Sequence, residues 1–300
     1  AAKNFNDVTV IVDKNDYSNL ENELKKNKGK TSLEFRKNMA SKAFGVTAFY
    51  DSVVAEWFNQ NLKINFPKLK TVFGEKLSEL RYGENPHQKS SIYLNNLTSD
   101  SLDLKKISGK ELSYNNYNDI YAGLDILFSS NKLPTTVIIK HANPCGVSIE
   151  NSPLKSFEQS LNCDPVSAFG GIVACNFKIT SQIANEINKT FYEVILAKGF
   201  DKNALKILKK KIKMRIIDIS EIKNYKKSSI KFFGKSFLLQ NENNIIFDKK
   251  KLKFVSKIKP NTREIKEIDF AFKVCKYVKS NAIVITNNFS TIGIGAGQPS

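Results

Sequence analysis

The stretch Thr136-Val-Ile-Ile-Lys-His-Ala-Asn-Pro-Cys-Gly146 decides how the rest of the chain is interpreted. Its apolar run, Val137–Ile139, is β-branched and continuous, which is typical of a buried strand. The residues that follow, Asn143-Pro-Cys-Gly146, are turn formers, so we expect the strand to end at Lys140 and His141. Ligands of open α/β sheets bind beyond the carboxyl ends of the strands. A site is therefore predicted at this strand end.

His141 and Lys140 form a chemically distinctive pair. The chain has only two histidines, and this one stands directly beside a lysine. A neighbouring ammonium disfavours the imidazolium, so the pair predicts a neutral imidazole that can take up a proton. Two alternatives stay open at this point. The histidine can simply cap the strand and hydrogen-bond the turn, or Cys145 beside it can act as a nucleophile.

Length and composition indicate a globular protein. Three hundred residues suit one large domain or two ordinary ones, and 41% hydrophobic residues can form a substantial core. No run approaches the roughly 18 apolar residues of a membrane span, and no secretory signal opens the sequence. The four cysteines lack the spacing of a disulfide framework. We expect reduced thiols, a cytoplasmic location and no membrane partner.

The formal charge of +18 raises the question of nucleic acid. Only four of the 47 basic residues are arginines, although nucleic-acid readers rely on Arg for bidentate and stacking contacts. The lysines are spread along amphipathic stretches such as Asn203–Lys213. The pattern favours a lysine-coated surface without a nucleic-acid partner. A basic nucleic-acid-binding module is the alternative function.

The hydrophobic pattern alternates between strands and helices. It predicts a first strand at Val8–Val12, a helix from Asp16 or Ser18 to about Lys28, and two helices within Ser32–Asn61 with a joint near Gly45. A connector then places a domain boundary, giving domains 1–66 and 67–300. Later strands are predicted at Ile172–Cys175, Phe191–Ala197, Met214–Asp218, Ser236–Gln240 and Ala282–Thr286, and later helices at Ile120–Ser129, Ile179–Lys189, Asp201–Lys211 and Ile265–Val278. The fold class is α/β, with layered mixed sheets and flanking helices.

Functional side chains are unusually dense in the loop Leu80–Gln88. Arg81 can bind a phosphate or carboxylate with its forked guanidinium, and Tyr82 can stack on a base. His87 is expected to support the loop rather than to act as a base. Further along, Asn115-Asn116 either cap a helix or read a substrate amide.

Two tempting motifs fail. Gly293, Gly295 and Gly297 alternate and do not form the dinucleotide-binding G-x-G-x-x-G pattern. Pro144-Cys145 resembles half of a zinc-deaminase site, but Ser148 stands where the second cysteine is required and no H-x-E motif is present. Zinc is therefore not expected.

Five motifs, in the same order along essentially the whole chain, resemble a known family. They are Arg81-Tyr-Gly-Glu-Asn-Pro-His-Gln88, Leu112-Ser-Tyr-Asn-Asn-Tyr117, Lys140-His-Ala-Asn-Pro-Cys-Gly146, Asp164-Pro-Val-Ser-Ala-Phe-Gly-Gly171 and Gly293-Ile-Gly-Ala-Gly-Gln298. The chain resembles the bifunctional purine biosynthesis proteins, which join phosphoribosylaminoimidazolecarboxamide (AICAR) formyltransferase to IMP cyclohydrolase.

The resemblance implies a reaction and its participants. A formyl group would pass from 10-formyltetrahydrofolate to the 5-amino group of AICAR, giving FAICAR, and the cyclohydrolase would close FAICAR to IMP. The family pattern also implies a homodimer and a cytidine-deaminase-like formyltransferase domain without zinc, and it leaves a monovalent cation open. The first domain would be the end of a methylglyoxal-synthase-like α/β cyclohydrolase domain, and the formyltransferase domain would continue beyond Ser300.

Residue roles follow from the same resemblance. His141 would be the proton acceptor, Lys140 would stabilise the transition state, and Lys3 would be the general acid/base of the cyclohydrolase. The substrate-binding residues would be Arg81, Tyr82, Asn116, Gly170, Glu193 and Asn281.

Overall fold

The computed structural model describes residues 1–95, 104–129, 133–222, 229–243 and 247–299. The chain divides into two compact units. The first contains Ala1–Leu77 and Tyr93–Ser99, and the second contains Ser78–Ile92 and Asp100–Ser300. In the described residues, no helix combines the length and the apolar character that crossing a bilayer requires.

The first unit is helical. It contains the 3-10 turns η1 (Ala2–Asn4) and η2 (Lys14–Asp16) and the helices α1 (Tyr17–Lys26) and α2 (Leu33–Asn61). Ser32 caps α2 by accepting the Phe35 N–H at 3.2 Å. The Arg36 guanidinium fastens the amino-terminal segment, donating to the carbonyl oxygens of Phe5 at 2.8 Å and Asn6 at 2.7 Å.

Two predictions for this unit were wrong. Val8–Val12 has no regular secondary structure and pairs with no strand among the described residues, and a strand needs a ladder partner to form. The predicted joint near Gly45 is absent, because α2 runs through it unbroken. One glycine costs a helix only about 1 kcal/mol relative to alanine, which is too little to interrupt one of this length.

The second unit is built on a mixed sheet, which has eight strands in the part of the chain that the structure describes. The order across the sheet is β11-β12-β5-β4-β6-β7-β8-β3. The strands are β3 (Lys105–Ser108), β4 (Thr135–Lys140), β5 (Asn143–Ile149), β6 (Ile172–Cys175), β7 (Val194–Ala197), β8 (Arg215–Asp218), β11 (Ile283–Asn287) and β12 (Ser290–Gly295). Neighbouring strands pair in parallel at β6–β7 and β7–β8, whereas β4 is antiparallel to both of its neighbours.

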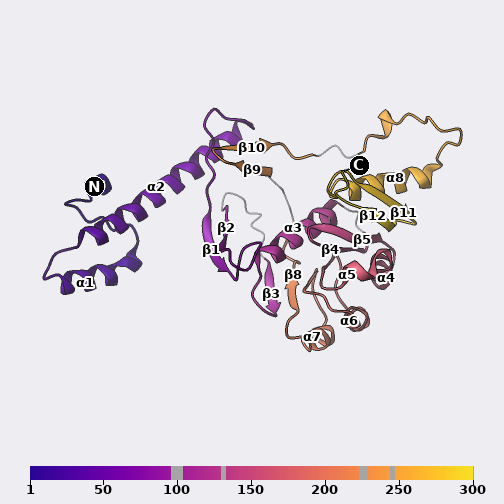
Figure 1. Cartoon of the computed structure of the whole chain (residues 1–300), viewed down its shortest axis with the longest axis horizontal. Coiled ribbons are helices and arrows are strands. Elements are labelled where there is room, and N and C mark those ends of the chain that lie inside the picture. Colours follow the sequence, from indigo (N-terminus) through magenta and orange to yellow (C-terminus); the bar gives the residue numbers. More distant parts are fainter. Residues whose placement is uncertain (96–103, 130–132, 223–228, 244–246, 300) are drawn as a thin grey trace. The chain divides into compact units, whose positions relative to one another are not determined.

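Helices cover both faces of this sheet (Figure 1). One face packs against α3 (Tyr114–Ser129) and α8 (Thr262–Cys275), and the other packs against α4 (Pro153–Cys163), α6 (Ser181–Asn188) and α7 (Lys202–Leu208). Alternate residues of the central strands enter the two cores, as the period of a strand requires. Val137 and Ile139 lie in the α3 core, for example, and Ile138 lies in the α4 core. The α/β class with a layered mixed sheet is confirmed.

The turn after β4 lies at other residues than the sequence predicted. β5 already begins at Asn143, so β4 and β5 form a hairpin whose two-residue turn is His141-Ala142. Ile138 pairs with Gly146 and Ile139 pairs with Pro144, which leaves Cys145 as the extra residue of a β-bulge. The turn-forming residues that were expected to end the strand are therefore absorbed by an irregular strand.

Two small sheets and two short helical elements complete the described secondary structure. β9 (Ser229–Phe233) and β10 (Ser236–Gln240) form one two-stranded sheet, and β1 (Glu75–Leu80) and β2 (Ser90–Leu94) form another. The short helix α5 (Pro165–Ala168) precedes β6, and the 3-10 turn η3 (Lys249–Lys251) precedes α8. β6 and β10 have the bounds that the sequence predicted.

Candidate functional site

The motifs of the second unit converge where the ends of the central strands meet on one side of the large sheet. This row of strand ends is called the sheet edge below. β4 and β12 reach this edge with their carboxyl ends, whereas β6, β7 and β8 run the opposite way and begin there. β4 ends at Lys140, as predicted, and the neighbouring parallel strands meet it there with their amino ends. Gly170, Glu193 and Arg215 stand at or just before the amino ends of those three strands.

The hairpin turn at this edge has an uncommon backbone. His141 has φ +53° and Ala142 has φ +57°, so both residues are left-handed although neither is glycine. Each such residue costs about 1–2 kcal/mol. The turn is held on both sides: the Asp119 carboxylate accepts the Ala142 N–H at 2.7 Å, and the Asn143 amide donates to the His141 carbonyl at 3.1 Å. Because the strand ends here, the two neighbouring side chains are freed from pointing to opposite faces.

Lys140 and His141 are both presented to the surface with capacity to bind. The Lys140 ammonium donates to the Phe169 carbonyl at 2.7 Å, and an ammonium has two further N–H groups. The His141 side chain is exposed, and among the described residues no hydrogen bond involves its imidazole. One group can donate to a ligand oxygen and the other can accept a proton.

The backbone before β6 lies very close to β4. Gly170 has φ +74°, which favours glycine, and its N–H donates to the Phe191 carbonyl at 2.8 Å. A Cβ on Gly171 would stand 2.6 Å from the Ile139 carbonyl oxygen. The paired glycines therefore let this loop pass close to the end of β4. There the Lys140 ammonium donates to the carbonyl of Phe169, which belongs to the loop.

A second polar cluster surrounds Glu193. The Asn116 amide donates to the Glu193 carboxylate at 2.8 Å, and the Arg215 guanidinium lies 3.5 Å from the same oxygen. Arg215 also donates twice to the Glu111 carbonyl, at 3.1 and 3.3 Å. Burial lowers the pKa of Arg215, and the nearby Arg81 cation lowers it further. Two guanidiniums close together favour an anion between or beside them.

Arg81 therefore belongs to the same edge as the hairpin. Its guanidinium stacks on the Tyr82 ring at 5.0 Å, and both residues lie in the loop between β1 and β2. The loop is tied to α3 by the Asn115 amide, which donates to the Glu84 carbonyl at 3.0 Å. Within the loop, the Gln88 side chain accepts the Asn85 N–H at 2.7 Å. His87 is exposed.

A cavity of about 300 Å³ opens beside the hairpin. Its walls come from the hairpin, from the segment before β6 and from the end of β12: Lys140, His141, Asn143, Pro144, Cys145, Asp164, Ser167, Ile294 and Ala296. Asn281 lies near the wall formed by the end of β12. Its N–H donates to the carbonyl of Gln298, just beyond β12, at 3.4 Å. Three sequence motifs thus meet around one hollow.

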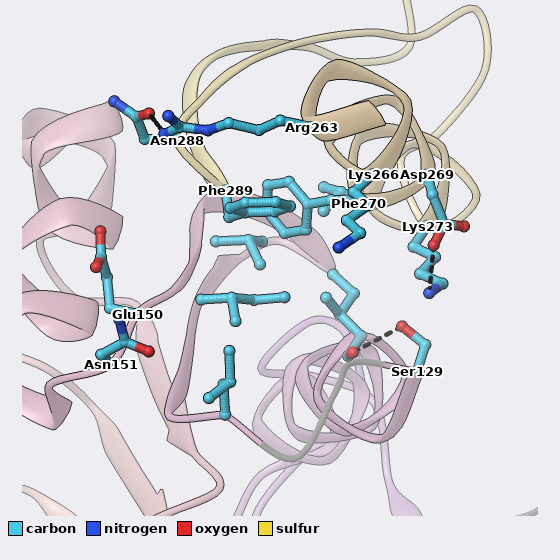
Figure 2. Close-up of a pocket in the computed structure, with 15 residues that line it drawn as sticks. Ser129, Glu150, Asn151, Arg263, Lys266, Asp269, Phe270, Lys273, Asn288 and Phe289 are labelled. Carbon is cyan, nitrogen blue, oxygen red and sulfur yellow. Dashed lines mark hydrogen bonds and ion pairs between the residues drawn. The ribbon is translucent and has the colours of Figure 1, made fainter. Parts of the chain in front are cut away.

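A larger cavity, of about 840 Å³, lies at the other end of β5. Figure 2 shows the Phe270 and Phe289 rings together along one wall, with the Lys266 ammonium turned toward the open middle. Its floor is aliphatic, and none of the residues that the sequence singled out lines it. No histidine is among its lining residues, so we assign the chemistry to the smaller cavity, where an imidazole and an ammonium stand side by side.

Two further residues from the sequence have clear environments. Burial raises the pKa of the Cys145 thiol to about 12, so the thiolate that a nucleophile needs is scarce at neutral pH. The alternative of Cys145 nucleophilic catalysis loses support. Lys3 is exposed and lies in η1 of the first unit.

Two members of this site, Asp119 and Arg215, were not predicted from the sequence. A signal existed for each. Arg215 is a buried cation at the start of β8, where it is costly without a partner, and Asp119 stands two residues after the quoted motif Leu112–Tyr117. Their partners lie far away in sequence, which no local pattern reveals.

Comparison with known proteins agrees with this geometry. The family model described as AICARFT/IMPCHase bienzyme matches residues 1–300. A bifunctional purine biosynthesis protein PurH from Thermoanaerobacter sp. (strain X514) is 41% identical over 300 residues, covering 99% of this chain and 58% of the relative. Proteins of the same name from Rhizobium rhizogenes (strain K84) and Trichodesmium erythraeum (strain IMS101) are 40% and 41% identical and are covered to 57% and 59% of their lengths.

The chain thus spans less than three-fifths of the length of these curated relatives. The match nevertheless extends over the chain from end to end. The chain belongs to the AICARFT/IMPCHase bienzyme family.

Proposed function

We propose that this protein transfers a formyl group from 10-formyltetrahydrofolate to the 5-amino group of AICAR. The observation that carries the proposal is the pairing of the Lys140 ammonium and the His141 imidazole on a turn that lines a cavity. The amine of AICAR is conjugated to its ring and is a weak nucleophile. A neutral base must take its proton as attack proceeds, and we assign this task to His141.

As His141 takes up the proton and becomes positive, a negative charge develops on the formyl oxygen. As the tetrahedral intermediate forms, this oxygen becomes negative, and a fixed ammonium stabilises it most effectively in a site with little water. Lys140 has N–H groups to spare after its contact with Phe169. The two groups therefore have complementary tasks at adjacent positions.

Nucleotide recognition falls to the rest of the edge. Arg81 would bind the phosphate with its guanidinium, and Tyr82 would offer an aromatic face. Glu193 would accept hydrogen bonds from ribose hydroxyls, because Asn116 and Arg215 hold its carboxylate in place. Gly170 would allow close approach of the ligand to the backbone, and Asn281 would contribute an amide from the opposite wall.

The wider proposal follows the family. Residues 1–66 would be the end of the cyclohydrolase domain, with Lys3 as its acid/base, and residues 67–300 would belong to a cytidine-deaminase-like formyltransferase domain without zinc. The parent protein would also cyclise FAICAR to IMP and would act as a cytoplasmic homodimer, without nucleic-acid or membrane partners. His87 would support the Arg81 loop.

Calorimetric titration of AICAR tests the nucleotide site, with and without a folate analogue. The parent should bind saturably, and Arg81→Ala should weaken binding by roughly 10-fold or more, because a charge-assisted bidentate contact is lost. Arg263→Ala is the matched control, since this arginine is also exposed but lies beside the larger cavity. Equal affinities of parent and Arg81→Ala would refute the assigned site. Affinity for nucleic acid that falls steeply with salt, with indifference to AICAR, would favour the basic binding module instead.

A transfer assay tests the base. In the full-length protein that carries this chain, His141→Ala should reduce kcat by about 10²- to 10⁴-fold while the circular dichroism spectrum is retained. A full transfer rate in this variant would exclude His141 as the proton acceptor.

A further inference from the structure

Asp119 lies directly beneath the hairpin turn yet has no part in the proposed chemistry. It belongs to α3, one helical turn beyond Asn116, and its side chain is only partly exposed. One carboxylate oxygen accepts the Ala142 N–H at 2.7 Å. This contact holds the second residue of the left-handed turn by its backbone.

Among the described residues, no other acceptor binds the N–H groups of this turn, so the Asp119 contact is its only support on the amide side there. Two successive left-handed residues turn consecutive N–H groups toward one side, a concave arrangement that suits an anion. The carbonyl side is held separately by Asn143, whose side-chain Oδ1 accepts the Lys279 N–H at 3.3 Å. Removing the carboxylate would leave the turn anchored on one side only.

The charge of Asp119 is costly where it stands. Burial raises the pKa of Asp119, and the nearby Glu193 carboxylate adds to the rise, whereas the Ala142 N–H and His141 oppose it. An asparagine could accept the same backbone N–H without that cost. A charge kept in spite of a desolvation penalty points to a task that needs the charge.

We infer that Asp119 is the positioning residue of the proposed base: its carboxylate fixes the His141-Ala142 turn and balances the positive charge that His141 gains on accepting the substrate proton. The part of the inference that concerns the charge of His141 rests on the proposed function. The proton moves from the attacking amine to the imidazole, and Asp119 itself neither gains nor loses one. Its role resembles that of the third member of a nucleophile–base–carboxylate arrangement, which orients the base.

Two substitutions separate position from charge. Asp119→Asn keeps an oxygen that can accept the Ala142 N–H but removes the charge, and Asp119→Ala removes both. Asp218→Asn is the matched control, because Asp218 accepts the backbone N–H of Ser220 at 2.8 Å at the opposite edge of the same sheet. All variants are made in the full-length protein that carries this chain.

The first measurement is hydrogen exchange of the Ala142 amide, which does not depend on activity. We expect exchange roughly 10-fold faster or more in Asp119→Ala, and protection within about 3-fold of the parent in Asp119→Asn and Asp218→Asn. Unchanged exchange in Asp119→Ala would show that the carboxylate does not hold the turn and would overturn the inference.

The second measurement is the steady-state kinetics of formyl transfer. We expect Asp119→Asn to lower kcat by roughly 10-fold or more with the KM for AICAR within about 3-fold, since the substrate is still bound but the proton is accepted less readily. A purely structural residue would not split kcat from KM in this way. A parental kcat in Asp119→Asn would overturn the role of the charge. An unsubstituted protein without transfer activity would refute the proposed function, and the exchange result would still decide whether Asp119 positions the turn.

Discussion

Two hairpin turns lie near the opposite ends of β5. Their backbone conformations are alike, but different contacts support them. His141-Ala142 connects β4 to β5, and Asn288-Phe289 connects β11 to β12 beside the far end of β5. All four residues have positive φ, between +53° and +58°, and none is glycine. Two-residue hairpin turns of this form usually contain glycine or asparagine. Both turns therefore carry backbone strain.

The strain is offset by different means. At the second turn the Phe289 ring packs edge-on against Phe270, with ring centroids 6.3 Å apart, and its N–H donates to the Glu267 carboxylate at 3.3 Å. At the first turn the His141 side chain is exposed and contributes no packing. Hydrophobic burial thus stabilises one turn, whereas polar contacts to Asp119 and Asn143 maintain the other. A strained turn that gains nothing from packing is the one expected at a site of chemistry.

The largest stability effect that tests this contrast is at Phe289. Phe289→Ala should lower the free energy of unfolding by about 2–4 kcal/mol, because it leaves a gap against Phe270. His141→Ala should change it by only about 0.5 kcal/mol, as is usual at the surface. Urea unfolding followed by circular dichroism measures both values. Equal losses at the two turns would mean that His141 packs as a structural residue.

A smaller effect concerns the pH dependence of stability. Because the folded-state pKa of Asp119 is raised, the folded protein binds its proton more tightly than the unfolded chain does. Stability from this group is complete below the unfolded value of 3.8 and is lost as pH rises through the folded value. Asp119→Asn lacks this loss, so its stability relative to the parent should improve from pH 3.5 to pH 7. Asp218→Asn supplies the comparison. A relative stability of Asp119→Asn that falls over this range would show that the carboxylate gains more from its hydrogen bonds than it loses by burial.

The comparison of the two turns also shows where sequence patterns succeed. The β-branched run before Lys140 predicted β4, and the run Ile172–Cys175 predicted β6 with its observed bounds, because burial on both faces leaves a strong local signal. The position of the first turn was not predictable in the same way. Pro144 and Gly146 predict a turn, but a bulge at Cys145 accommodates both residues within β5.

Long-range partners were beyond the reach of sequence alone. Glu193 was carried over from the family pattern, yet its contacts to Asn116, 77 positions away, and to Arg215 depend on how strands that are distant in sequence align. The left-handed turn was equally hidden, since neither His141 nor Ala142 has the composition that such turns usually require. The residues proposed for the chemistry were named from the sequence, whereas the contacts that position them became visible only in the structure.

The smallest effect addresses the strain itself. Ala142→Gly should raise the free energy of unfolding by about 0.5–1 kcal/mol, because relief of a left-handed alanine exceeds the extra entropy that glycine gives the unfolded chain. Asn288→Gly should be nearly neutral, since asparagine tolerates this conformation. The gain at Ala142 should come with a lower kcat in the full-length protein, because a looser turn places the His141 imidazole less firmly. A glycine at 142 that yields no gain would mean that the turn is relaxed, and Asp119 would then have no strain to hold.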